Sequence, residues 1–175
     1  MKISVTTTAA VALFVVGLFA CSSSIDENKK NNAAVAGRQL VETKKLPSFS
    51  IRNAAGETVN LSSLKGKKVF LNLWATWCPP CRQEIPYIEK LYSESDKNKV
   101  VFVLLSLDEN FEVAKEFAAS NVLQVPIFYA AENLPDLFNV RGIPATFIFN
   151  EEGELIKQIN SMEDYYTREY IELLN

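Results

Sequence analysis

The order of apolar and polar residues divides the chain into three parts. Residues 9–20 form an unbroken apolar run, residues 22–45 are mostly polar, and from residue 46 short apolar runs alternate with polar breaks. A polar segment of this composition buries too little apolar surface to fold by itself. The pattern therefore predicts one folded domain over residues 46–175, a flexible tether over residues 21–45 and an apolar leader over residues 1–20.

The predicted domain is built from strands that alternate with helices. The apolar runs at residues 69–75 and 100–107 are typical of strands that are buried on both faces of a sheet. Apolar residues recur at helical spacing between residues 79 and 96, which predicts an amphipathic helix there. The further predicted elements are strands at residues 47–51, 58–61, 125–130, 145–150 and 154–160, and helices near residues 111–118, 134–140 and 162–174.

The order of these elements indicates the fold class. Strands and helices alternate through the middle, two strands then follow each other directly, and a helix closes the chain. Alternation of this kind places parallel strand pairs at the centre of an α/β domain. We therefore expect a single domain with a central mixed β-sheet flanked by helices.

The apolar run near the N-terminus predicts a signal peptide. Its twelve residues rise only about 18 Å as a helix, less than the roughly 30 Å hydrocarbon core of a membrane. A buried N-terminal helix is the alternative, but the run has no polar face. The run ends in Leu18-Phe19-Ala20-Cys21, which resembles the lipobox of bacterial lipoproteins. That resemblance implies that Cys21 is lipidated and anchors the mature chain to a bacterial membrane.

The composition excludes several classes of function. The net charge is −3 and no basic run stands out, so nothing points to a nucleic-acid partner. The sequence has no histidine, which removes histidine-based acid–base catalysis and most zinc or copper sites. We therefore expect neither a metal nor another cofactor.

The candidate chemistry lies in the segment Trp77-Cys78-Pro79-Pro80-Cys81, between a predicted strand and a predicted helix. A helix N-terminus stabilises an anion, so it should lower the pKa of the Cys78 thiol and make it a nucleophile. Cys81 lies one turn further along the same face, where it should be more buried and act as the resolving cysteine. A permanent structural disulfide would close too small a loop to stabilise the chain much, and a metal site would lack two ligands.

Residues 72–86 and their surroundings resemble the thioredoxin superfamily, within it the TlpA/ResA-like branch of exported, membrane-anchored thiol–disulfide oxidoreductases. The likeness runs from about residue 47 to the C-terminus. It implies a thioredoxin-like fold with an N-terminal β extension and a strand–helix insert within residues 100–140. It also implies a reductase of protein disulfides in the cell envelope, in the periplasm or another extracytoplasmic space, which exchanges electrons with a membrane protein.

The same resemblance assigns further site residues. The segment from Gly142 to Thr146 matches the motif of the family's cis-proline, so Pro144 should be cis, and the backbone of Ile143 should face the substrate chain. Trp77 and Pro79 should contact the substrate as well.

Two polar residues near the cysteines bear on the acid–base chemistry. Glu84 lies three residues after Cys81. Proteins of the ResA-like branch have an acidic residue at this spacing, and it is linked to the acid–base behaviour of the thiols. A glutamate on the solvent-facing side of the helix is an equally good interpretation. Asn72 stands where cytosolic thioredoxins have a buried aspartate, and an amide cannot shuttle a proton.

Two other functions remain as alternatives. A peroxiredoxin-like thiol peroxidase shares the fold, but Leu71 and Ala75 occupy the positions where its proline and threonine would fall. A non-catalytic binding module with this fold would have no need of an intact pair of cysteines. The direction of electron flow stays open at this level, because two prolines between the cysteines stiffen the loop and also remove N–H donors from the thiolate.

Overall fold

The computed structural model describes residues 44–175. The signal peptide, most of the tether and the lipidation site at Cys21 lie outside the described residues. Ordered contacts with the sheet begin at the first described residues, because the Leu155 N–H donates to the Lys44 carbonyl at 2.7 Å and Lys45 forms a β-bridge with Glu154. Within residues 44–175, no helix is long and apolar enough to cross a membrane.

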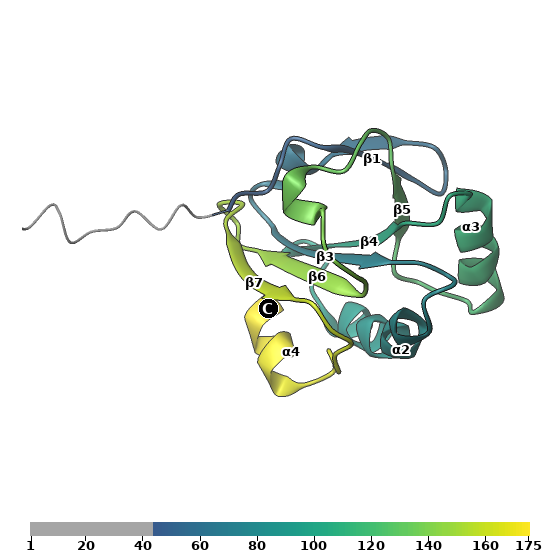
Figure 1. The fold of residues 1–175 in the computed structure, drawn as a ribbon. Helices are drawn as coiled ribbons and strands as arrows, with labels where there is room; N and C mark the ends of the chain where they lie inside the picture. Colours follow the sequence, from purple (N-terminus) through teal and green to yellow (C-terminus); the bar gives the residue numbers. More distant parts are fainter. Residues whose placement is uncertain (1–43) are drawn as a thin grey trace, which may run out of the picture. The chain divides into compact units, whose positions relative to one another are not determined.

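The domain is built on one seven-stranded mixed sheet, in the order β2-β1-β5-β4-β3-β6-β7. The β3–β4 and β4–β5 pairs are parallel, and every other neighbouring pair is antiparallel. The expected mixed sheet with parallel pairs at its centre is therefore confirmed (Figure 1). The strands are β1 (Ser50–Asn53), β2 (Thr58–Asn60), β3 (Lys68–Trp74), β4 (Val100–Ser106), β5 (Ile127–Ala130), β6 (Ala145–Phe149) and β7 (Leu155–Ile159).

The two faces of the sheet are covered differently. Three helices, α2 (Pro79–Glu94), α3 (Phe111–Ser120) and α4 (Arg168–Leu174), pack their apolar residues on one face. The segment before β1 (residues 46–49) and two 3₁₀ turns, η1 (Leu61–Leu64) and η2 (Asp136–Phe138), pack on the other face (Figure 1). Side chains of a strand alternate between faces, so β3 contributes Phe70 and Trp74 to the helical side and Leu71 to the other.

Several predicted boundaries were wrong. The strand expected at residues 47–51 is β1, which begins only at Ser50. The helix expected at residues 134–140 is only the short turn η2, which starts directly after Pro135. The strand expected at residues 125–130 begins at Ile127, after Pro126, which has no N–H to donate. The terminal helix begins at Arg168 rather than at residue 162, because tertiary contacts hold the preceding segment against the core.

Candidate active site

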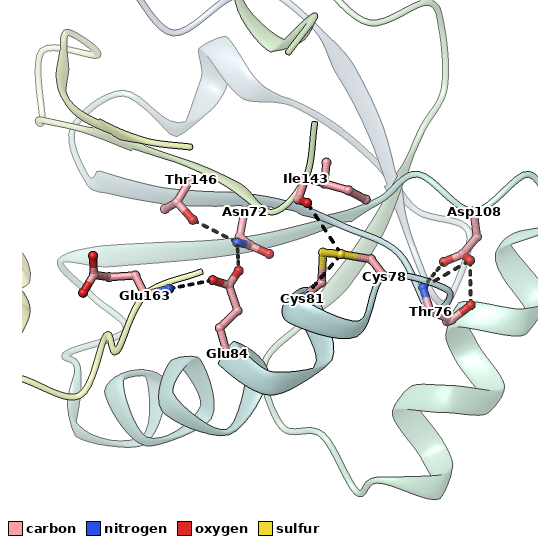
Figure 2. The surroundings of a disulfide bond; sticks show 9 residues. All are labelled: Asn72, Thr76, Cys78, Cys81, Glu84, Asp108, Ile143, Thr146 and Glu163. Atoms are coloured by element: carbon pink, nitrogen blue, oxygen red, sulfur yellow. Dashed lines mark hydrogen bonds between the residues drawn. A yellow bond between two sulfur atoms is a disulfide. The ribbon is translucent and has the colours of Figure 1, made fainter. Parts of the chain in front are cut away.

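The two candidate cysteines lie where β3 leads into α2, and they form a disulfide (Figure 2). Cys78 is the N-cap residue of α2, and its Sγ accepts a hydrogen bond from the Cys81 N–H at 3.3 Å. Pro79 and Pro80 occupy the first two positions of the helix, where a missing N–H breaks no intrahelical bond. The structure thus places the Cys78 sulfur at the positive end of the helix dipole, which favours a thiolate once the disulfide is reduced.

The burial of the two cysteines follows the expected order, but with a small difference. Cys78 is 3% exposed and Cys81 is fully buried, so Cys78 is less open than an exposed nucleophile would be. The neighbouring Trp77 is 65% exposed and stands out from the surface. A partner sulfur can therefore approach Cys78 only through a narrow opening. Of the two cysteines, only Cys78 is accessible from solvent.

A cis peptide bond between Ile143 and Pro144 faces the disulfide, as predicted. The carbonyl oxygen of Ile143 lies 3.7 Å from the Cys78 Sγ (Figure 2). Pro144 is buried and leads into β6, which pairs with β3, so the sheet itself carries this backbone to the sulfur.

Glu84 is fully buried, so the interpretation of it as a solvent-facing glutamate was wrong. Its Oε1 accepts a hydrogen bond from Asn72 Nδ2 at 2.7 Å, and its Oε2 accepts one from the Glu163 N–H at 3.2 Å. Burial raises the pKa of Glu84 to about 7, against the lowering effect of the two hydrogen bonds. The nearby Glu163 carboxylate also raises the pKa. This carboxyl group can consequently gain or lose a proton near neutral pH.

Asn72 connects Glu84 to a buried pair of hydroxyl groups. Its Nδ2 also donates to Thr146 Oγ1 at 2.9 Å, and the Tyr165 hydroxyl donates to the same oxygen at 2.7 Å. The Asn72 Oδ1 has no hydrogen-bond partner among the described residues. Burial raises the pKa of Tyr165, which keeps its hydroxyl protonated and able to donate. The amide at position 72 therefore holds the carboxylate that α2 supplies, although it does not titrate and cannot pass a proton to or from the thiols.

Sequence reasoning missed Thr146 and Tyr165. Thr146 had a detectable signal, because it lies two residues after Pro144 in the strand predicted at residues 145–150. The structure pairs this strand with β3 and places Thr146 opposite Asn72. Tyr165 had none, since it lies in a segment that was expected to be helical and is instead extended into the core against Phe70.

Asp108 holds the loop on the other side of the cysteines (Figure 2). Its carboxylate accepts from the Thr76 backbone N–H at 3.1 Å and from the Thr76 hydroxyl at 2.7 Å. The Ser106 hydroxyl donates to it at 2.8 Å. Two hydrogen bonds thus tie Thr76, two positions before Cys78, to Asp108, and a third ties Asp108 to Ser106 at the end of β4. Sequence reasoning gave no hint of them.

No group of three or more histidine, cysteine or acidic side chains within residues 44–175 could hold a metal ion. The reactive groups that the described part of the site offers are therefore a dithiol or disulfide and a buried carboxyl group. A dithiol at a helix N-terminus, with a cis-proline opposite, defines the class of thioredoxin-fold thiol–disulfide oxidoreductases.

Comparison with known proteins agrees with this class. The chain matches the model of the AhpC/TSA family over residues 43–158. It is 34% identical to the thiol-disulfide oxidoreductase ResA of Halalkalibacterium halodurans over 143 residues, which cover 81% of this chain and 78% of the relative. The ResA of Bacillus subtilis is 32% identical over 146 residues, which cover 82% of each chain.

Solved structures show the same fold. StoA from Bacillus subtilis matches with a TM-score of 0.58 at 30% identity, over 67% of this chain and 93% of that one. A thiol:disulfide interchange protein of the thioredoxin family from Chlorobium tepidum matches with a TM-score of 0.64 at 28% identity, over 75% of this chain and 96% of that one. The protein belongs to the AhpC/TSA family and is a thioredoxin-fold thiol–disulfide oxidoreductase.

Proposed function

We propose that this enzyme reduces protein disulfides in the bacterial cell envelope through the dithiol of Cys78 and Cys81. The observation that carries the proposal is the position of Cys78, capping α2 with its sulfur 3.7 Å from the backbone of Ile143. A partner chain that lies along this backbone would bring its own disulfide to Cys78, the cysteine of the disulfide pair that reaches the surface.

The reaction consists of two exchanges. The Cys78 thiolate attacks a sulfur of the partner disulfide, a mixed disulfide forms, and the other partner sulfur leaves as a thiolate. Cys81 then loses its proton and attacks the Cys78 sulfur, which releases the second partner sulfur. The partner gains two electrons, and the enzyme is left with the Cys78–Cys81 disulfide that the structure contains.

Glu84 is the proposed acceptor of the Cys81 proton. The two residues lie one turn apart on the same face of α2, and both are fully buried, so solvent has little access to that proton. A carboxyl group with a pKa of about 7 is ionised in a large fraction of molecules at neutral pH and can accept a proton. Asn72 and the Glu163 N–H each hold one oxygen of Glu84 and so set its orientation.

The substrate contacts follow from the surface around Cys78. Trp77 offers an exposed aromatic ring beside the sulfur, and Pro79 shapes the helix start next to it. Ile143 and Pro144 form the opposite wall, where the cis bond turns the carbonyl of Ile143 toward the sulfur. These four residues would bind a partner chain mainly through backbone and apolar contacts.

Insulin reduction tests the proposed activity. Full-length protein, kept reduced by dithiothreitol, should accelerate the reduction of insulin disulfides, whereas Cys78→Ala should not. Cys81→Ala should accumulate a mixed disulfide with its substrates, which a non-reducing gel would detect. Wild-type protein that is inert toward insulin and toward glutathione disulfide would contradict the proposal, and rapid peroxide consumption would favour a thiol peroxidase.

The direction of electron flow can be measured independently. A reduction potential of the Cys78–Cys81 pair near −270 mV would match thioredoxin and support a reductase, whereas a value near −120 mV is typical of a strong oxidant. The latter outcome would reverse the proposed direction.

Anchoring through Cys21 is part of the same proposal. A lipidated Cys21 would keep the domain at the membrane, next to a membrane protein that supplies its electrons. Mass analysis of the mature protein should show the lipid on Cys21, and an unmodified Cys21 would remove the anchor from the proposal.

A further inference from the structure

Two hollows in the surface flank the disulfide, and they carry opposite charges. The first, the basic groove, has a volume of about 590 Å³ and is lined by Lys44, Asp136, Arg141, Ile143, Gln158 and Asn160 among others. The second, the acidic pocket, has a volume of about 440 Å³ and is lined by Thr76, Trp77, Asp108, Glu109 and Val113 among others. Each hollow includes a residue next to the reactive sulfur, Ile143 in the groove and Trp77 in the pocket.

The cations of the basic groove are free to bind an anion. Lys44 and Arg141 are both exposed, and Asp136 carries the one carboxylate among the described residues that line the groove. The ion pairs found within residues 44–175 are Lys115–Glu112, Lys157–Glu169 and Arg168–Glu172, and none of them uses these two cations. The groove therefore has a net charge of +1.

The acidic pocket has the opposite balance. Asp108 and Glu109 line it, and no lysine or arginine among the described residues does, so its net charge is −2. The hydrogen bonds from Thr76 hold Asp108 in place. Trp77 and Val113 add exposed apolar surface, with 65% and 44% of their areas accessible. The pocket suits a side chain with an apolar stem and a positive end, as in lysine or arginine.

We infer that the partner of this enzyme is an extended polypeptide whose reactive cysteine has an acidic residue on one side and a basic residue on the other. The inference rests on the proposed function, because it takes Cys78 as the point of attack. Arg141 lies two residues before Ile143 in an irregular segment that precedes β6, so the backbones of the two residues are at most about 7 Å apart. An acidic side chain two to four residues from the partner cysteine would reach it. The opposite charges on the two sides then select one direction of the partner chain over the other.

Two peptides of reversed charge order test this inference. One carries two aspartates before its cysteine and two lysines after it, and the other carries the lysines before and the aspartates after. Each is prepared as a mixed disulfide with thionitrobenzoate and mixed with the reduced full-length protein at low salt in detergent micelles. A peptide of the same length with serines at the charged positions serves as the neutral reference.

We expect one charge order to react about tenfold faster than the other in 20 mM salt, and the difference to fade in 0.5 M salt as the charges are screened. Arg141→Gln should lower the ratio to about twofold, and Arg141→Glu should lower it further, without changing the rate for the neutral peptide. Arg52→Gln removes the same charge from β1, which β5 and β4 separate from β3, and it should leave the ratio unchanged.

The outcomes separate this inference from the proposed function. Equal rates for the two charge orders in the wild type would overturn the inference and leave the disulfide exchange intact. If the ratio of the rates for the two charge orders is the same in Arg141→Gln as in the wild type, the inference is also overturned. Release of thionitrobenzoate from none of the three peptides would overturn the proposed function together with the inference.

Discussion

The first turn of α2, which carries the cysteines, and the next turn, which carries Glu84, obtain their geometry in different ways. At the N-terminus of the helix, the cysteines obtain their geometry from five consecutive residues and from the helix dipole. One turn further on, the Glu84 carboxylate is held by groups from β3 and from the segment before α4, which are distant in sequence. The attacking group is thus a local feature of the chain, whereas the control of its proton depends on the whole domain.

This contrast is tested most strongly at the cysteines. Cys78→Ala should lower the rate of disulfide exchange by about three orders of magnitude or more, because the thiol that remains, Cys81, is fully buried and out of reach of a partner disulfide. Cys81→Ala should retain the first attack and fail to release the partner. Stopped-flow measurement of the first exchange separates the two variants, and equal loss in both would mean that Cys81 also makes the first attack.

The buried carboxyl group should make the stability depend on pH. Burial raises the pKa of Glu84 from 4.5 to about 7, so the folded chain holds this proton more tightly than the unfolded chain does. The contribution of Glu84 to the free energy of unfolding is therefore complete below pH 4.5. It falls by roughly 3 kcal/mol as the pH rises to 7. Urea unfolding of the oxidised protein should show this fall in wild type and a flatter profile in Glu84→Gln. A parallel pair of profiles would contradict the raised pKa.

The same variant should change the rate of the resolving step. Glu84→Gln keeps the shape of the side chain but cannot accept a proton, so release of the partner should slow about 100-fold at pH 7.5. In wild type this rate should rise with pH up to about 7, where Glu84 ionises, and the inflection should vanish in the variant. Glu89→Gln is a suitable control on the same helix. Within residues 44–175, the Glu89 carboxylate accepts hydrogen bonds from the backbone N–H groups of Gln124 and Val125 and from no side chain.

A smaller effect is expected at the far end of the buried network. Tyr165→Phe removes the hydroxyl that donates to Thr146, which should cost about 1 kcal/mol of unfolding free energy. The neighbouring Tyr166 is exposed and bonds to Glu94 at the surface, so Tyr166→Phe should cost less than about 0.5 kcal/mol. Thermal unfolding of both variants gives the comparison. Equal losses of unfolding free energy would mean that the buried hydroxyl stabilises the fold no more than the exposed one does.

Much of the fold was predictable because its signals are periodic. The strands β3 and β4 are buried on both faces of the sheet, and this burial gives their long apolar runs. The helix α2 buries one face, and this gives its apolar residues helical spacing. The prediction failed where tertiary contacts decide the local conformation. Residues 162–167 have a composition that allows a helix, yet Tyr165 packs in the core and the Glu163 N–H bonds to Glu84.

The candidate site divides in the same way. Cys78, Cys81 and the cis bond before Pro144 could be placed from short motifs, since each depends on adjacent residues. Burial of Glu84 could not, because a glutamate three positions after Cys81 could equally have pointed to solvent. Its orientation depends on Asn72, which the sequence places on a different element.

The sequence by itself determined that this protein has a dithiol at the start of a helix, in an α/β domain with a mixed sheet. It could do so because strand, turn and helix signals and the cysteine spacing are all local. Only the tertiary structure decided that a carboxyl group is buried near that dithiol, with a pKa near neutrality. The reason is that desolvation depends on everything that surrounds a group, and here residues from β3, β6 and the C-terminal segment enclose Glu84 and its partners.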